Sequence, residues 1–276
     1  MSINTEKNYA QGFHYIVKKK REGEEEGEVV ADIIGTSHTG PKKLYKLNPT
    51  IESAAIKAKK IAFEIVMTEE RKKELFDILP TLQQATRNSY TNFYNENYIE
   101  EKTYKYQSSD IKNKKVANYN KNGTETLILK ARGQNIDAVI PLETMKESAE
   151  NLHYLAMSEM FLEEKREDEK ISKKEIKACD IDSDNCHRNG DEALGKQAAK
   201  WRKRHDPARH HYLVKQRNYT LAKCSAPLIR EANPENRVLI AIGCGHLFGK
   251  HGVQALLKKE LGEDYSIEKF NSEPKI

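Results

Sequence analysis

Short apolar runs alternate with longer stretches in which apolar residues recur at helical spacing. Near the amino end, apolar runs at 13–18 and 29–34 flank a charged, glycine-containing segment, a pattern typical of a β-hairpin. Runs at 61–66 and 238–242 predict two more strands, and the second has no polar residue, so we expect it to be buried. Strands separated by helical patterns favour an α/β fold.

Helical periodicity occupies much of the chain between these strands. It predicts helices that cover the sheet, and Pro141 is a favourable first residue for one of the long ones. The fold class we predict is α/β, with a mixed β-sheet core surrounded by long helices. The predicted helices span about 50–60, 68–85, 141–160, 208–227 and 253–261.

The Tyr- and Asn-rich stretch 88–122 has no clear period. It fits a surface loop, a lid or two irregular helices, and the pattern does not choose among them. We expect a single domain over 1–276, with this stretch as an irregular lid or surface insertion.

Composition narrows the class of protein. Hydrophobic residues make up 37% and charged residues 32% of the 276 residues, which is polar but globular. No apolar stretch approaches the roughly 20 residues needed to span a bilayer, and the first residues lack the apolar core of a secretory signal. We therefore expect no membrane partner and a cytoplasmic location, with signal-independent secretion left open.

Charge is unevenly spread along the chain. The net charge is +5, and the stretch 196–215 is rich in Lys, Arg and His. Such a stretch can bind nucleic acid, but it is also typical of a solvated helix face, which is the interpretation we adopt. We therefore do not expect nucleic acid as a partner, while assembly into a homo-oligomer stays open. The four cysteines contain no Cys-x-x-Cys pair and match no usual zinc pattern.

Two Gly-x-x-His segments, Gly35–His38 and Gly243–His246, each follow a predicted strand. In α/β sheets ligands bind at this place, just beyond the carboxyl end of a strand. Glycine lets the backbone turn sharply and approach a ligand closely, so Gly35, Gly243 and Gly245 are candidate cofactor-binding positions. Histidine offers a neutral imidazole to a metal or accepts a proton near neutral pH. Histidines that only cap the backbone would give the same pattern, and position alone leaves both interpretations open.

Glu64 lies within a predicted strand that is apolar on both faces. A carboxylate buried there is costly unless it is paired or bound to a metal. The alternative is a glutamate at the edge of the sheet that reaches solvent.

Arg217 is anomalous in the same way, because it shares one helical stripe with Leu213, Leu221, Cys224 and Leu228. An arginine on an apolar face needs a carboxylate or an anionic ligand, unless it reaches the surface from the edge of the stripe. We expect Arg217 to point inward and to pair with Glu64 or Glu143, the carboxylates with independent reason to be interior.

These residues belong to a set of motifs that resembles the TraB/GumN/Tiki family. The motifs occur in family order and span nearly the whole chain, although each is short. Leu221 stands where the family commonly has methionine, and Phe248 where it has proline. The matching segments are Gly35-Thr-Ser-His-Thr-Gly40, Phe63-Glu64, Leu142-Glu143-Thr144, Arg217-Asn218 with Leu221-Ala222, and Ile242 to Gly249.

The resemblance implies a fold shared with the erythromycin-esterase-like and ChaN-like proteins. Its sheet is built from two halves, each with a strand ending in Gly-x-x-His, and the two ends face one another. It also implies that His38, Glu64 and His246 hold a divalent metal, since Tiki members are described as manganese- or cobalt-dependent peptidases. Zinc would suit these ligands too.

The activity that the resemblance implies is hydrolysis of a peptide or amide bond, so the expected partner is a peptide or small-molecule substrate. Glu143 would be a further ligand, an orienting residue or the general base, and Arg217 with Asn218 would complete the catalytic set. A second possibility stays open, because ChaN relatives bind haem and other relatives act in peptide-pheromone shutdown. A non-catalytic protein that sequesters a peptide or haem would use the same pocket.

Overall fold

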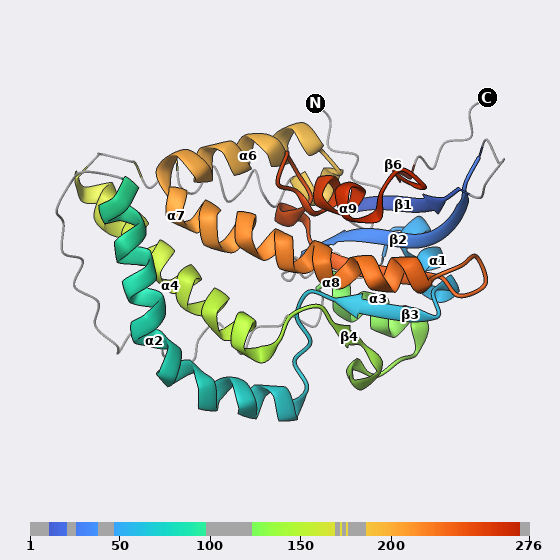
Figure 1. Ribbon diagram of the computed structural model, residues 1–276, viewed down its shortest axis with the longest axis horizontal. Coiled ribbons are helices and arrows are strands. Elements are labelled where there is room, and N and C mark those ends of the chain that lie inside the picture. Colours follow the sequence, from blue (N-terminus) through green and yellow to red (C-terminus); the bar gives the residue numbers. More distant parts are fainter. Residues whose placement is uncertain are drawn as a thin grey trace.

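The computed structural model describes residues 11–20, 26–37, 47–97, 123–168, 172, 175 and 186–270. The predicted α/β class is confirmed: a six-stranded mixed sheet has the order β4-β3-β5-β2-β1-β6 and packs against helices (Figure 1). The strands are β1 (Phe13–Lys19), β2 (Glu28–Thr36), β3 (Lys60–Phe63), β4 (Ile140–Pro141), β5 (Val238–Gly243) and β6 (Tyr265–Lys269).

The sheet places the two Gly-x-x-His segments side by side. β1 and β2 form the predicted antiparallel hairpin, whereas β2, β5, β3 and β4 run parallel to one another. Gly35 lies opposite Ile242, and Thr36 lies opposite Gly243. Both segments therefore begin at the same carboxyl edge of the sheet. His38 lies outside the described residues, so its distance from His246 stays a prediction.

Helices cover both faces of the sheet. On one face Ile51 and Ile128 pack with Ile34 and Phe63, and on the other Leu221 and Leu257 pack with Ile33 and Ile240. Helices α2, α4 and α6 extend beyond the sheet (Figure 1). The α-helices that the sections below use are α1 (Pro49–Lys57), α2 (Glu69–Asn97), α3 (Thr124–Arg132), α4 (Met145–Asp168), α6 (Glu192–His205), α7 (Pro207–Arg209), α8 (Arg217–Glu231) and α9 (Val253–Leu261).

The helix predicted to open at Pro141 begins later. Pro141 belongs to β4, where it lies opposite Phe63, and α4 starts only at Met145. Glu143 therefore lies in the connection between strand and helix. The first part of the stretch 88–122 continues α2, and residues 98–122 lie outside the described part of the chain. Of the helices described, none has both the length and the apolarity needed to cross a membrane.

The predicted stripe on the helix that carries Arg217 is partly wrong. Leu213 and Leu221 are buried, but Cys224 is exposed. The buried face of α8 instead follows Asn218, Leu221, Ala222, Ser225, Ala226 and Ile229.

Candidate functional site

Glu64 follows β3 directly and bridges the ends of two strands. The strand predicted over 61–66 ends at Phe63, so Glu64 lies just after it, but its side chain is buried as expected. The backbone N–H of Glu64 donates to the carbonyl of Ala241 over 3.0 Å, and its Oε2 accepts from the N–H of Gly243 over 2.6 Å. The carboxylate is therefore fixed against the first glycine of the second Gly-x-x-His segment.

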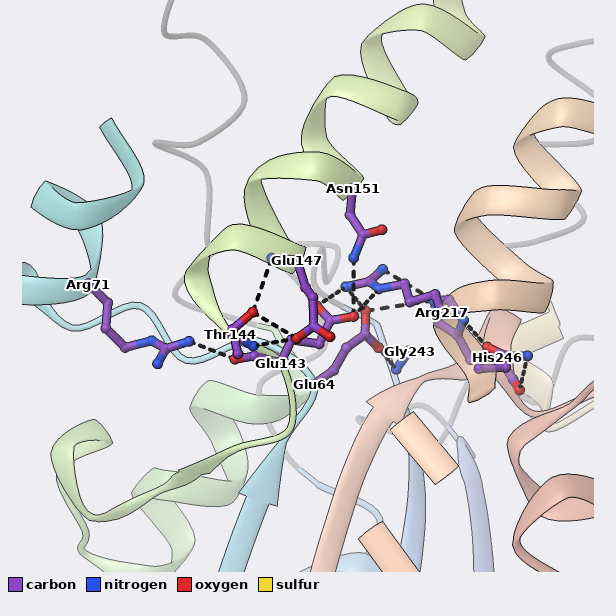
Figure 2. Close-up of polar contacts among 10 residues, drawn as sticks. Glu64, Arg71, Glu143, Thr144, Glu147, Asn151, Arg217, Gly243 and His246 are labelled. Atoms are coloured by element: carbon purple, nitrogen blue, oxygen red, sulfur yellow. Dashed lines mark hydrogen bonds and ion pairs between the residues drawn. The ribbon is translucent and has the colours of Figure 1, made fainter. Parts of the chain in front are cut away.

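Arg217 lies between two buried carboxylates (Figure 2). Its Nη2 is 2.8 Å from Glu64 Oε1 and 2.8 Å from Glu143 Oε2, and its Nε is 2.5 Å from Glu143 Oε1. The prediction that Arg217 points inward and pairs with Glu64 or Glu143 is confirmed, and it pairs with both. Among the described residues, this group sets two carboxylates against one guanidinium.

Burial raises the pKa of Glu143, the bonds from Arg217 lower it, and the charge of Glu64 adds to the rise. The net direction is upward, so Glu143 holds a proton more readily than an ordinary glutamate. Asn151 also donates to Glu143 Oε1 over 3.2 Å, and Arg71 donates to its backbone carbonyl over 2.8 Å (Figure 2). These contacts hold the connection before α4 in one arrangement.

His246 has a defined tautomer. Asn218 donates through Nδ2 to the carbonyls of His246 and His251, over 3.2 and 2.7 Å, which orients its amide. Its Oδ1 lies 2.5 Å from His246 Nδ1, so this ring nitrogen carries the proton and donates. The lone pair of the ring is therefore on Nε2, which lies 3.7 Å from Glu64 Oε1 and 3.4 Å from Arg217 Nη1.

The helix that carries Arg217 and Asn218 contains a π-helical segment. This segment, η3 (His210–Gln216), joins α7 to α8. Arg217 and Asn218 are the first two residues after it, and Asn218 is fully buried. π-helical turns are rare and frequent at functional sites. Helical periodicity in the sequence gave no sign of this segment.

The predicted cofactor-binding glycines differ in their surroundings. A side chain at Gly35 would collide with Leu247 and Phe13, 2.6 and 2.9 Å from the added carbon, so close packing explains this glycine. Gly243 supplies its N–H to Glu64, and Gly245 is exposed with open space around it.

Cys244, between the last two glycines, is unsuited to act as a thiolate. Burial raises the pKa of its thiol to about 12, and nearby Cys186 and carboxylates contribute. One of these carboxylates is Glu125, a buried residue in the first turn of α3 that the sequence analysis missed. The neighbouring Thr124 exchanges hydrogen bonds of 3.0 and 3.1 Å with Ser37, the residue before His38. The start of α3 therefore borders the site.

The side-chain donors of this site meet some of the requirements of a divalent-metal site. Metal–ligand bonds of about 2.0–2.2 Å place two ligands of one ion about 3–4 Å apart, and His246 Nε2 and Glu64 Oε1 are 3.7 Å apart. The hydrogen bond that His246 Nδ1 donates to Asn218 Oδ1 fixes the ring in the way typical of metal-binding histidines. No group of three His, Cys, Asp or Glu side chains within the described residues is arranged to hold a metal. The third predicted ligand, His38, lies outside them.

Comparison with known proteins gives one match. A family model for the TraB/PrgY/gumN family matches residues 22–268. No curated protein and no solved structure gives a significant match.

Proposed function

The chain belongs to the TraB/PrgY/gumN family, and on this premise we propose that it is a metal-dependent hydrolase of peptide or amide bonds. The observation that carries the proposal is the arrangement of Arg217 between Glu64 and Glu143, next to Nε2 of His246. Among the described residues this group has an excess of carboxylates over guanidinium groups, and two of its donors lie at metal-bridging distance. A divalent cation would balance that excess.

His246 Nε2 and Glu64 Oε1 would hold the metal together with His38, and manganese, cobalt and zinc all suit such ligands. The bound ion would supply Lewis acidity, which lowers the pKa of water and polarises a carbonyl group. The protein would supply the remaining roles. Asn218 keeps the lone pair of His246 directed into the site.

Glu143 is the candidate proton acceptor. Its raised pKa makes it a stronger base than an ordinary carboxylate, and enzymes tune general bases in this direction. Arg217 is the candidate partner for negative charge that develops on a substrate oxygen, because a guanidinium held by its neighbours needs little reorganisation.

Elemental analysis followed by a cleavage assay tests the proposal. The purified chain is assayed against a peptide library after chelation and again after addition of manganese, cobalt or zinc. We expect cleavage only with metal, at a stoichiometry of one site per chain. Tight binding of a peptide or of haem without cleavage under all metal conditions would instead support the sequestering protein, and cleavage that survives chelation would contradict both.

A further inference from the structure

Asn151 lies at the boundary between the buried carboxylates of the site and the solvent. It belongs to α4 and is half-buried. The side chains of Glu64 and Glu143 are only 2% and 1% exposed, whereas those of Arg217 and His246 are 11% and 12% exposed. A molecule that approaches the site from solvent therefore meets Asn151, Arg217 and His246 before it meets either carboxylate.

The side-chain amide of Asn151 has a defined orientation. Its Nδ2 donates to Glu143 Oε1 over 3.2 Å, and Arg217 Nε donates to the same oxygen over 2.5 Å. A carboxylate oxygen accepts hydrogen bonds, so the nitrogen of the amide faces Glu143 and its oxygen points to one side (Figure 2). Because Asn151 and Arg217 share one oxygen of Glu143, the two side chains lie next to each other.

The amide oxygen of Asn151 is open to a ligand. Among the described residues, Oδ1 accepts no hydrogen bond, and the atom is not fully buried. An accessible acceptor therefore lies beside Arg217, which is the candidate partner of a substrate oxygen in the proposed function. An extended peptide presents the N–H and the C=O of one residue on the same side of the chain. The pair of Asn151 and Arg217 therefore matches the two hydrogen-bonding groups of a peptide residue.

We propose that Asn151 Oδ1 accepts a backbone N–H of the substrate, and so selects an amide over an ester at that position. This inference rests on the proposed function and names the group by which the site recognises its substrate class. An ester has an oxygen in place of the N–H, so two hydrogen-bond acceptors would face each other at Oδ1. A site that accepts a hydrogen bond from its substrate rejects an analogue that lacks the donor. If Asn151 only held Glu143 in place, it would give no such preference.

Fluorescence anisotropy on the full chain, treated with a chelator, tests the inference without turnover. The parent probe is a labelled hexapeptide with blocked ends, chosen as the tightest binder of a random library, and each analogue has an ester in place of one backbone amide. The test variant is Asn151→Leu, which keeps the approximate size, and Asn151→Ala repeats the test with a smaller side chain. The control is Asn135→Leu, because Asn135 is exposed and its Nδ2 also donates to a carboxylate, that of Asp137, over 2.8 Å.

We expect one ester analogue to bind the wild-type chain on the order of tenfold more weakly than the parent peptide, which corresponds to the loss of one hydrogen bond. Both Asn151 variants should bind the parent peptide more weakly by a similar factor and should bind that analogue no worse than the parent. Asn135→Leu should behave like the wild type. Equal affinities across the ester series in the wild type, an unchanged preference in the Asn151 variants, or no binding by any library peptide would overturn the inference.

The outcomes separate this inference from the proposed function. A preference for the amide that depends on Asn151, in a chain that cleaves no peptide with any metal, would refute the hydrolase and support the N–H contact. Metal-dependent cleavage by a chain whose preference does not depend on Asn151 would refute the contact alone.

Discussion

Two clusters in this protein place a carboxylate between a histidine and an arginine, yet they differ in what they can do. In the first cluster, Asp32 of β2 lies 2.8 Å from His14 Nε2 and 2.9 Å from Arg237 Nη2. The other ring nitrogen of His14 faces the hydroxyl of Thr50 at 3.4 Å, and the ring stacks on Phe270. One carboxylate meets one guanidinium, so the charges balance.

The second cluster is the site around Glu64. It contains the same kinds of group and one more carboxylate, that of Glu143, so among the described residues its carboxylates outnumber its guanidinium group. Nε2 of His246 faces Glu64 and Arg217, whereas the second ring nitrogen of His14 faces a hydroxyl. Asp32 lies opposite Leu239, near the amino end of β5, whereas Glu64 contacts Gly243 at the carboxyl end, about 13 Å further along at 3.3 Å per residue. Residue types alone do not make a reactive site. A second carboxylate and a position beyond the strand ends distinguish the second cluster.

Exchanging the central carboxylate in each cluster is the strongest test of this difference. Glu64→Gln keeps size and removes charge, and we expect it to abolish metal-dependent cleavage while circular dichroism stays native. Asp32→Asn makes the same change in the balanced cluster and should keep the activity, provided that it folds. Metal-dependent activity in Glu64→Gln would remove Glu64 from the mechanism.

Removing the arginines compares the stability of the clusters. Arg217→Ala leaves two buried carboxylates without their cation and should lower the free energy of unfolding by about 3–5 kcal/mol. Arg237→Ala leaves Asp32 bonded to His14, so we expect a smaller loss of about 1–3 kcal/mol. Urea denaturation of both variants measures the difference. Equal losses would mean that the second carboxylate adds no dependence on the arginine.

The orienting partners of the two histidines allow a finer comparison. Asn218→Ala frees the ring of His246, and loss of such a partner weakens metal binding by about 10–100-fold. Thr50→Ala removes the weaker contact to His14 and should leave metal affinity unchanged. Titration calorimetry with manganese or cobalt reports both. Unchanged affinity in Asn218→Ala would assign the ring orientation of His246 to other contacts.

The smallest expected effect is on the pH dependence of stability. It arises at His210, which lies outside both clusters and has lysines nearby. His210 has a folded pKa of about 4, below the ordinary 6.5, because it is buried and lies near Lys203. Its contribution to stability is full above about pH 6.5 and is lost as the pH falls towards 4, since the unfolded chain takes up the proton first. We expect this loss to be about 1–2 kcal/mol after allowance for partial exposure.

Urea unfolding at several pH values measures this loss. His210→Gln should flatten the stability profile in the window from pH 6.5 to 4. A wild-type profile already flat there would contradict the assignment.

Much of the fold and of the site was predictable, because these parts follow from local patterns in the sequence. The apolar runs indicated the hairpin and β5. The apolar run that contains Glu64 and the helical stripe that contains Arg217 predicted two charges that had to meet inside the protein. The pairing with Glu143 was predicted although its helix was placed too early. Pro141 fits a first helical turn and also a short edge strand, and only pairing with Phe63 decides between them.

Other features depend on contacts that no local pattern carries. α3 and Glu125 follow the Tyr- and Asn-rich stretch, where periodicity offers no guide, and Thr124 finds Ser37 only in the folded chain. The strand β6 is half exposed, and its placement requires β1 as a partner. The roles of His38, Glu64 and His246 in metal binding stay predictions.

The π-helical segment before Arg217 has a consequence for insertions and deletions. A π turn amounts to one extra residue accommodated within an α-helix. Deleting one residue between His210 and Gln216 would let the chain return to ordinary α-helical bonding and would change the phase of everything after it by about 100°. Either α8 would keep its packing against the sheet and α7 would rotate, or Arg217 would swing away from Glu64 and Glu143. The orientation of α7 and η3 relative to Arg217 thus depends on one extra residue in the helix.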